Sequence, residues 1–272
     1  MRLWVLALTI TCVAAVVPPS APAETRLDPV AALRVQLASG TGVTATQVTT
    51  FTEPGEKPNT YRDSGVHRLA NGEVVASETL NRTDGTYWIR RIDFKDRYYE
   101  QHRDQHRYLP AGKSWSIIEV KQSLALTCGH LRLSHPATLK ALLSGATGKR
   151  PAGVHDGTRT TLYEGVITLG ELTEVDPDVR IGRNRPTGAY LQVRINWQLW
   201  TGQDQLIRRC HSSSWQPGLL GEGEDTFDPV QEVVDVRLSR WGHAADIRPP
   251  AADQVATLDE LTFPDKDPAD SP

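Results

Sequence analysis

The sequence lacks the surplus of basic residues that could follow a nucleic-acid backbone. Its 30 lysines and arginines face 33 aspartates and glutamates, which leaves a formal net charge of −3. Proteins that bind DNA or RNA usually concentrate positive charge in one stripe or patch. We therefore expect no nucleic-acid partner for this chain.

Catalytic motifs are also lacking. The chain has no G-x-S-x-G nucleophile elbow, and the serine run 212–214 lies in a strand-like segment instead of at a strand-to-helix turn. His102 and His106 have the i, i+4 spacing of a helical metal pair, but no Glu stands in the H-E-x-x-H position between them. The sequence therefore predicts a protein that is not an enzyme and holds no metal and no cofactor.

Long apolar runs are missing after residue 23, so we expect no membrane-spanning segment in the mature chain. At the start, Arg2 precedes the apolar run Leu3–Val17, and Ala21-Pro22-Ala23 fits an A-x-A cleavage site. This order is typical of a secretory signal peptide, residues 1–23, cleaved after Ala23. Lipidation at Cys12 is the alternative. The expected location is secreted, either extracellular or in the cell envelope.

Two cysteines, Cys128 and Cys210, follow the predicted signal peptide. An even number of cysteines in an exported chain favours a disulfide between them. Two free buried thiols, or a metal pair with His130 and His211, are the alternatives. Because His211 is adjacent to Cys210, it would point to the opposite face of a strand, which favours the disulfide over the metal pair.

The sequence does contain segments in which apolar and polar residues alternate. Within 189–201, apolar residues occupy every second position (Leu191, Val193, Ile195, Trp197 and Leu199), and polar residues stand between most of them. A period of two is typical of a strand with one buried face, as in an antiparallel sheet. Further strand candidates are 42–51, 64–70, 73–82, 86–94, 97–102, 108–120, 158–169, 204–215 and 231–241. Asn71-Gly72 and Asp84-Gly85 separate successive candidates as hairpin signals.

Helix signals are fewer. Asp28 and Pro29 begin a helix that ends at Gly40, a second helix is expected at 134–144, and a short final one at 252–261. The predicted fold class is α+β, with a large curved antiparallel sheet that forms a half-open barrel over two or three short helices. No internal linker divides the chain, so we expect a single domain at 24–262 and a disordered tail at 263–272.

Four segments resemble motifs of a known family. Residues 109–115 (LPAGKSW) are similar to an LPxGKxW stretch, and residues 157–165 (GTRTTLYEG) to a GTxTTxYxG strand. Residues 199–209 (LWTGQDQLIRR) are similar to an LWxGxDxLxRR hairpin, and 236–242 with 247–250 end the domain in the same manner. Together they resemble the exported proteins of actinomycete-type bacteria that share the LolA, LppX and LprG fold. The resemblance implies a half-open barrel with an apolar cavity that carries or senses lipids or acylated lipoproteins in the cell envelope.

Geometry supports a cavity as well. Two ten-residue helices, each about 15 Å long and about 10 Å wide, cannot cover a sheet that is more than about 40 Å across. We therefore expect an apolar cavity between the sheet and the helices at 28–38 and 134–144, with Leu191, Val193, Ile195 and Trp197 on its wall. The predicted function is a binding protein for a hydrophobic ligand, a lipid or acyl chain, with a possible envelope protein partner. A non-enzymatic interaction or sensor scaffold with a filled core is the alternative.

Overall fold

The computed structural model describes residues 28–83, 87–181, 184–217 and 229–262. The predicted signal peptide and the predicted disordered tail lie outside these residues. Within the described ranges, one twelve-stranded sheet has the strand order β14-β6-β5-β4-β3-β2-β1-β13-β12-β11-β10-β9. Neighbouring strands are antiparallel, except that β14 and β6 run parallel.

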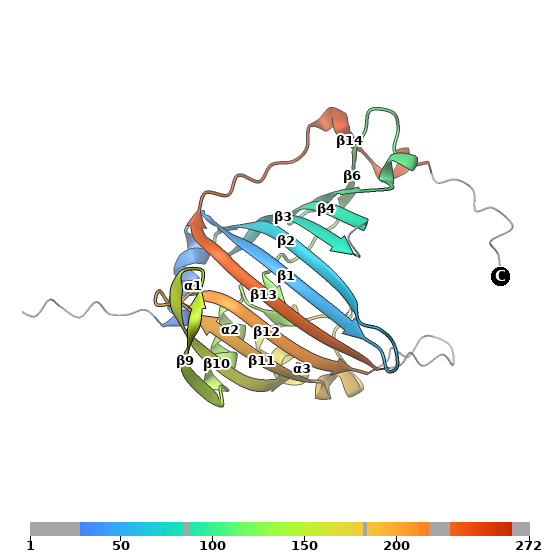
Figure 1. Ribbon diagram of the computed structural model, residues 1–272. Coiled ribbons are helices and arrows are strands. Elements are labelled where there is room, and N and C mark those ends of the chain that lie inside the picture. The colour runs from blue at the N-terminus through green and yellow to red at the C-terminus, as the bar shows by residue number, and fades with distance from the viewer. Residues whose placement is uncertain (1–27, 84–86, 182–183, 218–228, 263–272) are drawn as a thin grey trace, which may run out of the picture.

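Short helices accompany this sheet. The strands are β1 (Gly42–Thr52), β2 (Asn59–Ala70), β3 (Glu73–Thr83), β4 (Tyr87–Phe94), β5 (Arg97–His102), β6 (Trp115–Glu119), β9 (Gly148–His155), β10 (Thr158–Thr168), β11 (Arg194–Thr201), β12 (Ile207–Gln216), β13 (Val230–His243) and β14 (Val255–Ala256). The helices are α1 (Pro29–Ala38), α2 (Pro136–Ser144) and α3 (Leu169–Val175), and a small hairpin joins β7 (Thr127–Cys128) to β8 (Leu131–Arg132). The predicted fold class is confirmed: Figure 1 shows an open, curved sheet with the helices against one of its faces.

Local signals in the sequence account for several of these elements. The Asp28 side chain accepts a hydrogen bond from the Ala31 N–H at 2.8 Å, and Pro29 stands in the first turn of α1. Between β2 and β3, both Asn71 and Gly72 have positive φ angles, 56° and 85°. Two positive φ angles in a two-residue loop define a type I′ turn, so the predicted hairpin is confirmed. The second hairpin signal, Asp84-Gly85, lies outside the described residues.

Two sequence predictions were wrong because contacts from distant residues override the local pattern. The strand expected at 189–201 begins only at Arg194, since residues 188–192 form a 3₁₀ turn against α3. The contact is close: a Cβ on Gly170 would lie 3.0 Å from the Leu191 carbonyl oxygen. The helix expected at 252–261 is replaced by two 3₁₀ turns around β14, because Val255 pairs with Trp115 of β6.

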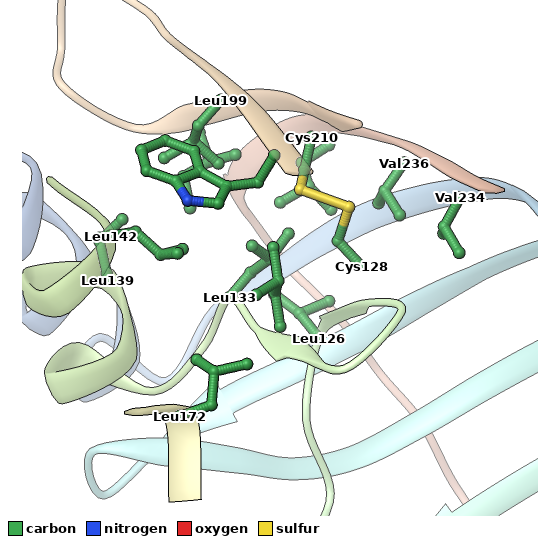
Figure 2. Packing of buried hydrophobic residues seen from close by; sticks show 14 of the residues in the cluster. Leu126, Cys128, Leu133, Leu139, Leu142, Leu172, Leu199, Cys210, Val234 and Val236 are labelled. Carbon is green, nitrogen blue, oxygen red and sulfur yellow. A yellow bond between two sulfur atoms is a disulfide. The ribbon is translucent and has the colours of Figure 1, made fainter. Parts of the chain in front are cut away.

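The main hydrophobic core lies between the three helices and strands β10–β13. Leucines from the helices pack with large side chains of the sheet, and Figure 2 shows this packing around the disulfide. The buried members include Leu33, Leu37, Leu139, Leu142, Leu172, Ile195, Trp197 and Leu199. The space between this part of the sheet and the helices is therefore packed with side chains. Among the described residues, a hollow of about 210 Å³ lies between α2, α3 and strands β10 and β11, beside Trp197.

The apolar side of the sheet changes face between its two halves. Directly paired residues of antiparallel strands share a face. One such row runs Leu199–Cys210–Val236–Gln47–Asp63–Asn81 across six strands, and it turns from apolar to polar at Gln47. We call the face that carries this row, against which the helices pack, the inner face. On β2–β6 a second set of apolar residues lies on the other face, the outer face, although Leu69 of β2 and Val74 of β3 stay in the main core.

A second, smaller core covers that outer face. It contains Ala76, Ile92, Tyr99 and Trp115, and Ile247 from the segment after β13 completes it with 4% exposure. In Figure 1 this segment leaves β13 and passes β3 and β4 on its way to β14. The C-terminal segment thus takes the role on the outer face that the helices take on the inner face. On the inner face, α1 contacts β2 and β3 where Leu69 and Val74 join the main core.

Candidate ligand cavity

A cavity of about 490 Å³ lies on the inner face where the helices do not reach. Its floor is formed by strands β1–β4, and residues 123–132, which we call the roof, extend over it. Val179 and its neighbours close one side. Ligand sites in proteins have volumes of about 300–1,000 Å³, so the size suits a small molecule or one acyl chain.

Short side chains explain why this part of the inner face is hollow. One row of paired residues runs Leu238–Ala45–Gly65–Thr79–Arg91, so that small residues occupy its middle three positions. A Cβ on Gly65 would lie 2.5 Å from the Glu78 carbonyl oxygen, so no larger residue fits there without a backbone shift. Because these side chains are short, the floor cannot reach the roof.

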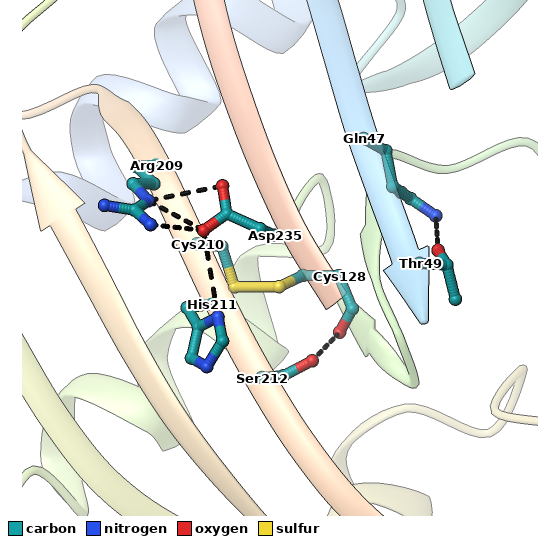
Figure 3. Close-up of a disulfide and its surroundings, with 8 residues drawn as sticks. All are labelled: Gln47, Thr49, Cys128, Arg209, Cys210, His211, Ser212 and Asp235. Carbon is teal, nitrogen blue, oxygen red and sulfur yellow. Dashed lines mark hydrogen bonds and ion pairs between the residues drawn. A yellow bond between two sulfur atoms is a disulfide. The ribbon is translucent and has the colours of Figure 1, made fainter. Parts of the chain in front are cut away.

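The disulfide ties the roof to the sheet. Cys128 is bonded to Cys210 of β12, with a Cα–Cα distance of 6.3 Å. The Ser212 hydroxyl donates a hydrogen bond to the Cys128 carbonyl oxygen at 3.1 Å, as Figure 3 shows. Next to the cysteine, Gly129 has a φ angle of +60°, a conformation that glycine adopts without strain. The predicted disulfide is thus confirmed, and it holds the centre of the cover over the cavity.

The two ends of the roof are held by polar side chains. Just before the roof begins, the Gln122 amide donates to Asp93 Oδ1 at 3.1 Å and to the Phe94 carbonyl at 2.9 Å. At its end, Arg132 donates to Asp176 at 2.9 Å and lies 3.1 Å from Asp178. Hydrogen bonds from Arg132 and Ser123 lower the pKa of the Asp178 carboxyl. The roof is therefore attached at its start, its middle and its end.

The floor carries ionisable groups whose partners lie on neighbouring strands. Asp93 is 7% exposed and lies 3.0 Å from Arg91, whose guanidinium stacks 3.8 Å above the Tyr98 ring. Burial raises the pKa of Asp63, although its hydrogen bond from Asn81 acts in the opposite direction. Burial also lowers the pKa of His67 to about 4, so the His67 imidazole is neutral at pH 7. Most of the charge at the floor is thus already paired.

Two polar atoms of the floor have no hydrogen-bond partner among the described residues. They are Nδ1 of His67 and Nε of Arg91, and both atoms are buried. Both residues border the cavity. Buried polar atoms in native proteins are nearly always hydrogen-bonded, to protein, water or ligand. Two nitrogens beside the cavity therefore lack a hydrogen-bond partner among the described residues, and the apolar side chains of Leu124, Leu126, Val179 and Val236 border the same cavity.

None of the four residues predicted as ligand-lining borders this cavity. Val193, Ile195 and Trp197 are 6%, 1% and 2% exposed and belong to the main core, whereas Leu191 lies in the 3₁₀ turn before β11. Trp197 also borders a hollow of about 210 Å³ between α2 and α3. Val193 borders an open hollow of about 680 Å³ beside Trp215. Their role as ligand contacts stays a prediction, and the site described above is built from other residues.

The sequence held one signal for the cavity that alternation alone did not reveal. In β1–β3 the inner positions carry small or polar residues (Ala45, Gln47, Gly65, Ser77 and Thr79) while their neighbours on the outer face are mostly larger. Recognising that signal requires the register of three strands, which cannot be read from the sequence alone. The roof could not be predicted either, because residues 120–135 contain only the two-residue strands β7 and β8.

Other kinds of site are not seen in the described part of the chain. No three His, Cys, Asp or Glu residues there gather closely enough to hold a metal ion. His102 ends β5, and His106 follows in a 3₁₀ turn, so the two do not share a helix face. None of the described helices has the length and apolar character needed to cross a bilayer.

Comparisons with known proteins give structural neighbours and no relatives in sequence. No protein-family model matches the chain, and no curated protein does. The Mycobacterium tuberculosis lipoprotein LppX is 17% identical, with 81% of this chain and 98% of that one covered and a TM-score of 0.44. A LolA superfamily protein of Nitrosomonas europaea is 10% identical, with 79% and 92% covered and a TM-score of 0.26. The site described above rests on this chain's own residues.

Proposed function

We propose that this chain is a non-enzymatic binding protein of the cell envelope that carries or senses a lipid or acyl chain. The observation that carries the proposal is the cavity of about 490 Å³ between the floor of β1–β4 and the roof. Side chains of Leu124, Leu126 and Val179 give it an apolar part, and the polar floor gives it a few hydrogen-bonding groups. This combination is typical of ligand sites that fix one orientation of an apolar molecule.

Export fits the same proposal. Disulfides persist in oxidising compartments outside the cytoplasm, and the bond between Cys128 and Cys210 holds the roof. Together with the signal peptide expected at 1–23, it favours a protein that works in the envelope or outside the cell. Its lipid would then come from, or go to, a membrane or a protein partner of the envelope.

One observation favours the scaffold alternative. The core beneath α1 and α2 is packed, as in a protein that offers its surface and not its interior. The two functions differ in what occupies the cavity over β1–β4: a ligand in a carrier or lipid sensor, and water in a scaffold.

Native mass spectrometry separates the two. The exported protein, purified without detergent, should carry an acyl-bearing molecule, and solvent extraction should release it. The variant Thr79→Trp places an indole ring on the cavity floor and should lose this mass, because the ring fills the space. Arg82→Trp adds the same ring on the opposite face of β3 and should retain it. If the wild-type protein carries no bound molecule and takes up no added lipid, the carrier proposal is wrong and the scaffold alternative is supported.

A further inference from the structure

The ligand's polar group has a defined place in the cavity, and this inference rests on the proposed function and refines it. Arg91 lies on β4 and His67 on β2, and both side chains are on the inner face. Only β3 separates them, with Ser77 paired to His67 and Thr79 paired to Arg91. Strands lie about 4.8 Å apart, and Arg91 is two residues along β4 from Asp93, the residue level with His67. The two Cα atoms are therefore about 12 Å apart, and one polar group above β3 lies within reach of both side chains.

The Arg91 side chain is held in position before any ligand arrives. Its guanidinium is fixed by the ion pair with Asp93 at 3.0 Å and by the Tyr98 ring below it at 3.8 Å. Those contacts use the terminal nitrogen and the planar face, and they leave the Nε–H without an acceptor. An Nε–H can only donate, so the missing partner is an acceptor oxygen.

His67 differs from Arg91 in the hydrogen-bond partner that it can take. Its imidazole is neutral, because burial lowers its pKa to about 4. The unpartnered Nδ1 either donates or accepts, depending on the tautomer. A hydroxyl group satisfies both cases, because it can donate and accept.

Charge argues against an anionic head group. The ionised side chains that border the cavity balance each other, with Asp63, Asp93 and Asp178 on one side and Arg91, Arg132 and Arg180 on the other. His130 also faces the cavity, and burial lowers its pKa while Glu232 acts in the opposite direction. Arg91 and Arg132 are already ion-paired, and Arg180 donates to the Pro177 and Val179 carbonyl oxygens. A carboxylate or phosphate would therefore lose its hydration without finding a surplus of positive charge, which is costly in a buried site.

The geometry points to an uncharged acyl ester with a free hydroxyl, a monoacylglycerol-like lipid, bound with its head inward. The ester carbonyl accepts from Arg91 Nε–H, the hydroxyl meets His67 Nδ1, and the acyl chain runs along Leu124, Leu126 and Val179 under the roof. The head is thus bound on the floor, and the chain is covered by the disulfide-tied segment.

Competition binding tests this with three probes that share a long chain: 1-monooleoylglycerol, oleate and hexadecane. The delipidated full-length protein should bind monooleoylglycerol about tenfold more tightly than either of the others, the effect of one hydrogen bond to a charged donor. Arg91→Lys keeps the positive charge but removes the Nε–H, and His67→Phe keeps a ring but removes both nitrogens. Each variant should lose most of the preference for monooleoylglycerol over hexadecane while its hexadecane affinity stays the same.

Arg90→Lys is the matched control, because Arg90 is the neighbouring arginine on the outer face, paired with Glu78 at 2.5 Å. It should keep the full preference. Equal binding of all three probes by the wild type, or tighter binding of oleate, overturns the head-inward assignment and leaves the carrier proposal standing. Binding of none of the probes ends the carrier proposal itself.

Discussion

The two halves of the sheet share one inner face but fill it in opposite ways. Between β10 and β13, large side chains such as Trp197 and Leu199 meet three helices in a packed core. Over β1–β4, the same face carries Ala45, Gly65 and Thr79, and its cover is a loop. The cavity therefore results from short side chains under a cover without a helix. The width of the sheet alone does not produce the cavity, because the second apolar cluster of β2–β6 packs on the outer face.

We call β10–β13 with the helices the packed half and β1–β4 with the roof the hollow half. The largest expected effect on stability comes from the disulfide that joins the roof to the packed half. Replacing both Cys128 and Cys210 with Ser should lower the free energy of unfolding by about 4 kcal/mol, since the bond closes a loop with a sequence separation of 82. Urea denaturation under oxidising conditions measures the change. Lipid affinity should fall as well, because the roof is freed at its centre. An unfolding free energy within about 1 kcal/mol of the wild type would contradict the role of the disulfide.

Truncating a side chain in the packed half should lower the free energy of unfolding more than truncating one in the hollow half. Leu142→Ala in α2 removes a side chain that is 1% exposed and should destabilise the fold by about 2–5 kcal/mol. Thr79→Ala should change the unfolding free energy by less than about 1 kcal/mol, because the Thr79 side chain already borders empty space. Equal losses in the two denaturation curves would show that the halves are packed alike.

The hollow half should also make stability depend on pH through His67. The pKa of this histidine is about 4 in the folded protein, against an ordinary value of 6.5. As the pH falls below 6.5, the unfolded chain binds a proton that the folded protein does not. The stabilisation is therefore complete above pH 6.5 and is lost toward pH 4, by about 2–3 kcal/mol.

Denaturation curves between pH 7 and 4 test this expectation on the wild type and on His67→Phe. The variant should lose less stability than the wild type over this range, because other groups titrate equally in both proteins. If the two proteins show the same pH dependence, groups other than His67 cause it.

How far the sequence predicts the molecule differs between the halves. Alternation in 194–201 and the turn signal at Asn71-Gly72 are local, and so the packed strands and that hairpin were predictable. Edge strand β9 was missed because Pro151 interrupts its pattern, although proline is tolerated on an edge. The change of apolar face, the pairing of β14 with β6 and the position of the cavity depend on partners far away in the sequence, so no local pattern contains them.

The central claim is that the ligand lies in the hollow half and not beneath the helices. The most direct measurement is photo-crosslinking with a monoacylglycerol that carries a diazirine near the end of its chain, followed by peptide mapping of the full-length protein. The account predicts labelled peptides from the roof, residues 123–132, and from the segment around Val179. Labels concentrated on β10, β11 and α2, around Trp197 and Leu142, would contradict this claim and show that the ligand binds in the packed half.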